Sequence, residues 1–116
     1  MNLVVHATDL ASVRHHFEPL GLAEGALDRC RFFWLMGEEG EQFGAYALEV
    51  RGSQGWLIAG VGGLPGHDLT VEFLPFIEAQ LKGCDAIYIQ TRRPGLIKKL
   101  ADCGYLLDSS ILVKPL

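Results

Sequence analysis

Three glycines, Gly62, Gly63 and Gly66, lie within five residues, directly after an apolar run and before a segment with helical spacing, residues 71–82. Glycines between a strand and a helix let backbone N–H groups approach a phosphate at the positive end of the helix. The same pattern is typical of a turn before a helix capped by a polar side chain such as Asp68. A carboxylate at that place would repel a pyrophosphate. We therefore favour the turn and keep the phosphate loop as the alternative.

Two side chains near the glycines could accept a proton from an amine. Glu49 comes late in a predicted strand and shares a face with Phe43, Ala45 and Ala47, so it either points toward covered surface with a raised pKa or ends the strand in solvent. We favour the solvent-exposed strand end. His67 is most simply a polar turn residue beside the start of a helix.

Cysteines and histidines carry little further chemistry. Cys30, Cys84 and Cys103 are odd in number and lack the CxxC spacing, so we expect buried, reduced thiols and neither a disulfide framework nor a zinc site. His15 and His16 are adjacent on one predicted helix and are expected to point in different directions. The sequence therefore predicts no metal site.

Arg92 and Arg93 follow a predicted strand, residues 85–90, at the end of the sheet where ligands of open α/β sheets bind. They could meet a phosphate or the acidic surface of a protein partner. A solvated loop is the interpretation that we favour for them.

The bulk composition excludes several classes of protein. A chain of 116 residues, 49% of them hydrophobic, predicts one domain over residues 1–116 with a real core. The net charge of −4 argues against a nucleic-acid partner. The chain has no basic stretch followed by an apolar one at its start, and no apolar run near the ~20 residues that span a bilayer. We expect a cytoplasmic protein that does not enter a membrane.

Hydrophobic periodicity and turn residues predict alternating strands and helices. We expect strands at residues 1–7, 31–36, 43–50, 56–61, 85–90 and 105–115, and helices at 8–21, 71–82 and 94–104. The hairpin-linked middle strands should pair antiparallel, whereas the two strands that flank the second helix should form a right-handed parallel crossover. The fold class is α/β with a mixed sheet.

The last third of the chain reads GCDAIYIQTRRPGLIKKLADCGYLLDSSILVKPL, with a Gly104–Tyr105 pair closing the helix and Lys114 near the end of the final strand. This order, over roughly residues 31–116, resembles the GNAT superfamily of N-acetyltransferases. The resemblance implies a GNAT-like fold, with a central mixed sheet of about six strands flanked by helices. The chain is also similar to small, divergent members of that fold encoded by phages and prophages.

The family binds acetyl-CoA where two parallel strands splay apart, with the pyrophosphate on the start of the helix after the fourth strand. The resemblance makes Gly62, Gly63 and Gly66 the cofactor-binding candidates. However, the arginine or glutamine of the family's loop is absent, and the glycine spacing differs. The position that matches the family's general-acid tyrosine is Leu100, which cannot donate a proton.

These absences favour a non-catalytic interaction or structural protein on a degenerate GNAT-like scaffold, phage- or prophage-encoded, as a virion component or assembly factor. It would need no cofactor, would bind a protein partner through residues such as Arg92 and Arg93, and would lie in the host cytoplasm or the virion. The alternative is an acetyl-CoA-dependent N-acetyltransferase acting on an amine. A homo-oligomer is left open in both interpretations.

Overall fold

The computed structural model describes residues 3–91, 93–108 and 111–116. The helices are α1 (Leu10–Phe17), the 3₁₀ turn η1 (Glu18–Leu20), α2 (Leu69–Gln80) and α3 (Pro94–Asp102). The strands are β1 (Leu3–Thr8), β2 (Arg31–Gly37), β3 (Gln42–Arg51), β4 (Gln54–Gly62), β5 (Ala86–Gln90), β6 (Leu106–Asp108) and β7 (Ile111–Pro115).

The seven strands form one mixed sheet in the order β1-β2-β3-β4-β5-β7-β6. The strands of the sheet pair antiparallel, except for β4 and β5, which run parallel around the crossover through α2. The predicted α/β fold class and the parallel crossover are confirmed.

The final segment differs from the prediction. Residues 105–115 were expected to form one strand, but β6 pairs antiparallel with β7 and Leu107 lies opposite Leu112. The last pair of this ladder is Asp108↔Ile111, and residues 109–110 lie outside the described residues. The sheet therefore has seven strands instead of about six.

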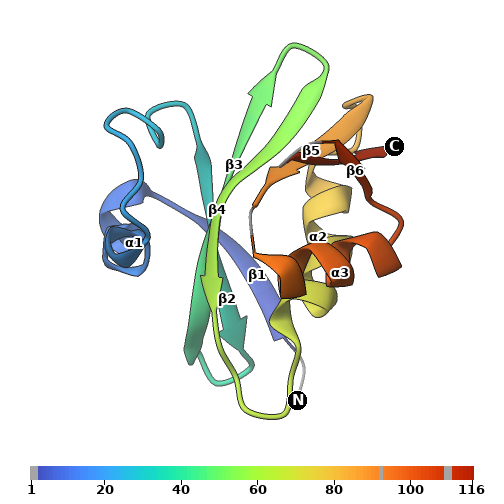
Figure 1. Ribbon diagram of the computed structural model, residues 1–116. Coiled ribbons are helices and arrows are strands. Elements are labelled where there is room, and N and C mark those ends of the chain that lie inside the picture. The colour runs from blue at the N-terminus through green and yellow to red at the C-terminus, as the bar shows by residue number, and fades with distance from the viewer. Residues whose placement is uncertain (1–2, 92, 109–110) are drawn as a thin grey trace.

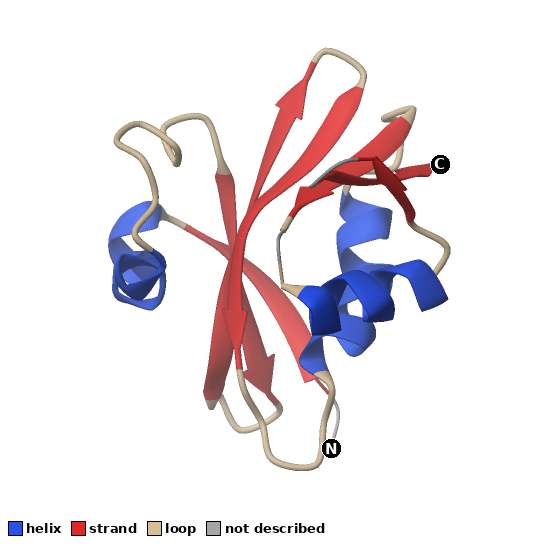
Figure 2. Cartoon of the chain, in the orientation of Figure 1, coloured by secondary structure: helices blue, strands red, loops and turns tan. Residues whose placement is uncertain are grey.

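The helices cover the two faces of the sheet unequally. α2 and α3 lie together on one face, whereas α1 lies on the other face (Figures 1 and 2). α1 packs on β2, β3 and β4. Neighbouring aromatic residues of β2 therefore separate: Phe32 is buried under α1, and Phe33 is buried on the α2 side.

Side-chain caps start two of the helices. Asp9 accepts a hydrogen bond from the Ser12 N–H (2.9 Å) at α1, and Asp68 caps α2. Pro75 lies inside α2, so the helix begins before the proline instead of at it. No helix in the described part of the chain has the length and apolar character needed to cross a membrane.

Candidate functional site

The parallel strands β4 and β5 separate toward their carboxyl ends. They pair only from Gln54↔Ala86 to Leu57↔Ile89, while β4 continues to Gly62. Figure 1 shows the two strands diverging there. Within the described residues, the second half of β4 thus has no partner on the β5 side, and we call this place the splay.

A β-bulge marks the splay. On β3, Ala47 lies opposite Ala59 and Leu48 lies opposite Leu57, so Ile58 is the extra residue of β4. Ile58 also lies beyond the paired part of β5. Ile58 therefore has no register partner on β3 or among the described residues of β5, at the point where the strands part.

The glycine-rich stretch beyond β4 forms a turn and a capped helix. Gly66 has a φ of +80° after Pro65, and the His67 N–H donates to the Leu64 carbonyl (3.1 Å), as in a type II turn. The Gly63 N–H donates to the Phe43 carbonyl (3.0 Å). The favoured turn is confirmed, and the possible binding of a phosphate by the same loop is taken up below.

Charged groups cluster at the start of α2. The Asp68 carboxylate accepts from the Val71 N–H (3.5 Å) and lies 3.2 Å from the Lys99 ammonium of α3. His67 Nδ1 lies 2.9 Å from the Glu72 carboxylate. His67 is thus a polar turn residue at the helix start, as predicted.

Glu49 is buried, with 8% of its surface exposed, so the favoured prediction of a solvent-exposed strand end is wrong. Its carboxylate accepts a hydrogen bond from Arg51 Nε. It shares a face with Ala45 and Ala47 as predicted, but Phe43 packs on the opposite face. A bulge causes this switch, because Leu35 lies opposite Gly44 and Met36 opposite Gln42, which leaves Phe43 as the extra residue.

A stack of planar side chains stands beside Glu49 on the α1 face. The Arg51 guanidinium carbon lies 4.7 Å from the centre of the Trp56 ring, and the Tyr88 ring stacks on Trp56 with centroids 4.9 Å apart. Since β3 and β5 flank β4 on opposite sides, Arg51 and Tyr88 meet opposite faces of the indole. This stack was not predicted from the sequence, although the i, i+2 spacing of Glu49 and Arg51 places them on one strand face.

Leu100 and Tyr105 belong to the core. Leu100 is 1% exposed and Tyr105 is 2% exposed. Burial raises the pKa of the Tyr105 hydroxyl, which has no hydrogen-bond partner among the described residues. Lys114 lies over the Tyr105 ring and donates to Glu78 of α2 (2.6 Å). These residues hold β7 to the helices, and neither Leu100 nor Tyr105 presents a proton donor at the splay.

The remaining predicted residues lie apart from the splay or outside the described residues. Arg93 is the exposed N-cap residue of α3, and Arg92 lies outside the described residues. Cys30 is partly buried, and burial is the main cause that raises its thiol pKa to about 11. The rings of His15 and His16 lie against each other with centroids 4.2 Å apart and planes tilted by 37°, so the expected divergence of these side chains is wrong.

Two hollows in the described surface also lie elsewhere. One of about 400 Å³ lies between α1 and residues 21–28, and one of about 530 Å³ lies beside the start of β2. Neither hollow is lined by residues of the splay. A cofactor site at the splay is therefore supported by strand geometry and not by either cavity.

No protein-family model matches the sequence, and no curated protein matches it by sequence. Solved structures do match the fold. An IAA acetyltransferase from Bacillus cereus ATCC 14579 superposes with a TM-score of 0.79 at 13% identity, over 99% of this chain and 100% of that one. A dodecameric spermidine N-acetyltransferase from Vibrio cholerae gives 0.77 at 10% identity, over 97% and 93%. A Bacillus subtilis acetyltransferase in complex with CoA gives 0.69 at 13% identity, over 99% of both chains.

These neighbours contradict the interpretation of the chain as a non-catalytic interaction or structural protein, because they are acetyltransferases. They favour the alternative that the sequence left open. The CoA complex likewise gives no support to the expectation that no cofactor is needed. The similarity to phage-encoded members stays a prediction. At sequence identities of 10–13%, a match to a solved structure shows a shared fold and not a shared activity. The chain therefore has the fold of the GNAT superfamily.

Proposed function

We propose that the chain is an acetyl-CoA-dependent N-acetyltransferase that acts on an amine. The observation that carries the proposal is the splay: parallel pairing stops at Leu57↔Ile89, and Ile58 has no register partner on β3 or among the described residues of β5. An opening between parallel strands leaves room for a thioester, and backbone N–H groups that point into it would stabilise the oxyanion that forms when an amine attacks the carbonyl. The acetyltransferase neighbours support this interpretation, and the dodecameric one supports a homo-oligomer.

The glycine-rich stretch is the proposed position of the acetyl-CoA pyrophosphate. A Cβ atom added at Gly63 or at Gly66 would meet no atom within 4 Å, so the backbone there is open to a ligand. In the first turn of α2, Asp68 satisfies the N–H groups of Val71 and Glu72. The N–H groups ahead of them in the helix are the free donors that a phosphate requires.

The amine needs a proton acceptor, and Glu49 is the better placed of the two predicted candidates. Glu49 lies opposite Trp56, and Trp56 precedes Ile58 by two residues. His67, by contrast, lies beyond the end of β4 and pairs with Glu72. One carboxylate oxygen of Glu49 holds Arg51, and the other accepts no hydrogen bond from the described residues. With Leu100 at the position of the family's tyrosine, we propose that water protonates the departing thiolate.

The test is acetyl-CoA binding by calorimetry, with free coenzyme A as the comparison, followed by thiol release in the presence of a panel of amines. Saturable binding in the micromolar range together with amine-dependent thiol release is the expected result. No heat up to millimolar acetyl-CoA would overturn the proposal.

Removing the charge of Asp68 should tighten acetyl-CoA binding. Asparagine caps a helix about as well as aspartate, so Asp68→Asn should keep α2 intact. Loss of one negative charge near a pyrophosphate is worth about 1 kcal/mol at an exposed site, or about fivefold in Kd. Calorimetry on the variant measures the change, and Asp68→Ala, which also removes the cap, separates charge from helix stability. An unchanged Kd for Asp68→Asn would place the pyrophosphate away from α2.

A further inference from the structure

Arg51 is held by two neighbours. Its Nε donates to the buried Glu49 carboxylate, and its guanidinium carbon lies over the Trp56 ring, 4.7 Å from the ring centre. Trp56 is itself fixed, because Tyr88 stacks on it and its Nε1 donates to Gln54 (3.2 Å). An arginine in such a frame loses little side-chain entropy when it binds a ligand.

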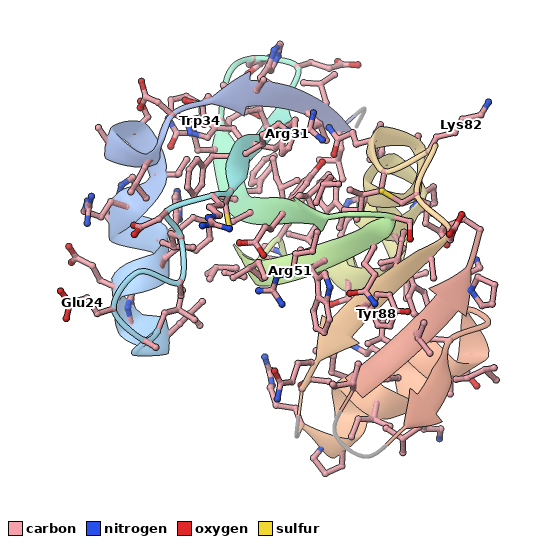
Figure 3. All side chains as sticks on the ribbon, turned by 90° about the horizontal axis from the view of Figure 1, so that it is seen from above. Glu24, Arg31, Trp34, Arg51, Lys82 and Tyr88 are labelled. Atoms are coloured by element: carbon pink, nitrogen blue, oxygen red, sulfur yellow. The ribbon has the colours of Figure 1, made fainter. Side chains whose placement is uncertain are left out.

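The outer edge of the Arg51 guanidinium is free. Nε is the guanidinium nitrogen that has a protein acceptor among the described residues, and the side chain is 51% exposed. Figure 3 shows Arg51 on the open side of the sheet, between the α1 side and Tyr88. The two terminal nitrogens therefore form a fork of donors, which matches a carboxylate in a bidentate pair.

The fork lies near the proposed site of chemistry. Trp56, on which Arg51 stacks, precedes Ile58 by two residues, which is about 7 Å along a strand. The stack continues across the sheet as an apolar row, since Tyr88 lies opposite Val113, and Val113 opposite Leu106, which is 65% exposed. A ligand that reaches from Ile58 to Arg51 would pass the Trp56 ring, and the apolar row extends from that ring to the other side.

We propose that Arg51 binds the carboxylate of the acceptor, and that the acceptor is an amine with an apolar body and a carboxylate. This inference rests on the proposed acetyltransferase function and names its substrate class. Glu49 offsets part of the charge of Arg51, so recognition depends on the geometry of the fork more than on net charge. Arg51 is a positioning residue in this site.

The experiment compares two amines that differ in the carboxylate, 4-(aminomethyl)benzoate and benzylamine, in acetyl-CoA-dependent thiol release. The wild-type chain should prefer the carboxylate by at least about tenfold in kcat/KM, the effect of one charge-assisted hydrogen-bonded pair. Arg51→Gln should abolish the preference mainly through KM, and Arg51→Lys should keep part of it. Lys82→Gln is the matched control, because it removes a positive charge far from Arg51 (Figure 3).

Because each preference is a ratio measured within one variant, partial unfolding does not alter it. Equal use of the two amines, use of neither by a chain that binds acetyl-CoA, or a preference that survives Arg51→Gln would overturn this inference alone. If acetyl-CoA does not bind, the proposed function fails, and Trp56 fluorescence in a Trp34→Phe background still decides the inference. A saturable change with 4-(aminomethyl)benzoate and none with benzylamine would support carboxylate binding at Arg51, and no change with either would refute it.

Discussion

Glutamate in place of Gly63 is expected to weaken acetyl-CoA binding about a hundredfold, whereas glutamine at the same position should weaken it only a few-fold. A side chain fits there, because a Cβ at Gly63 would meet no atom within 4 Å. The backbone φ of Gly63 is not positive, so a side chain adds no conformational strain. The added carboxylate would lie beside the pyrophosphate, and unit charges about 4 Å apart near a protein surface repel by 1–4 kcal/mol, roughly five- to a thousandfold in Kd.

Calorimetry on both Gly63 variants measures the effect, and thermal unfolding checks that both are folded. Glutamate and glutamine have nearly the same shape, so the difference between them reports charge. If the two variants weaken binding equally, the effect is steric and the loop does not hold the pyrophosphate. If neither does, the cofactor binds elsewhere.

Alanine in place of Gly44 is expected to lower the free energy of unfolding by about 3 kcal/mol or more, the upper range for forced overpacking. Gly44 lies on β3 opposite Gly62 of β4. A Cβ there would lie 2.6 Å from the Gly62 Cα and still closer to the Val61 carbonyl oxygen. Both are backbone atoms, so the strands themselves must move.

Urea unfolding measures this change, and Gly60→Ala is the matched control. Gly60 lies on β4 opposite Tyr46, and a Cβ there would meet only the Tyr46 Cβ, at an ordinary 3.8 Å. Gly60→Ala should leave stability within about 1 kcal/mol. Equal midpoints for the two variants would show that β3 and β4 are not packed as closely as described. Because the Gly44 contact also sets the end of β4, acetyl-CoA binding should weaken in Gly44→Ala.

Two family residues that this sequence lacks suggested one function, and the fold suggested another. Leu100 in place of a tyrosine, and the missing arginine or glutamine of the loop, favoured a non-catalytic protein. The acetyltransferase neighbours contradict that weighting. Backbone features can explain the difference, because a bulge such as that at Ile58 leaves no signature in a motif of side chains.

Local patterns in the sequence were sufficient for the order of elements. Apolar spacing and cap residues depend on neighbours within a few positions. The sequence therefore predicted α2, whose Leu74 and Ile77 are buried, together with the cap at Asp68 and the β4–α2–β5 crossover. The turn at Pro65 and Gly66 belongs to the same class, because proline and glycine limit the backbone directly.

Only the tertiary structure decided which side chains meet. A bulge depends on the register between two strands, and each bulge shifts the side chains that follow it to the other face. That is why Phe43 lies on the opposite face from Ala45, and why Ile58 falls at the splay. The Arg51–Trp56–Tyr88 stack joins three strands. Apart from the division of residues 105–115 into β6 and β7, the sequence alone therefore determined the elements and their order, whereas the candidate site arose from pairing between strands, which no local pattern encodes.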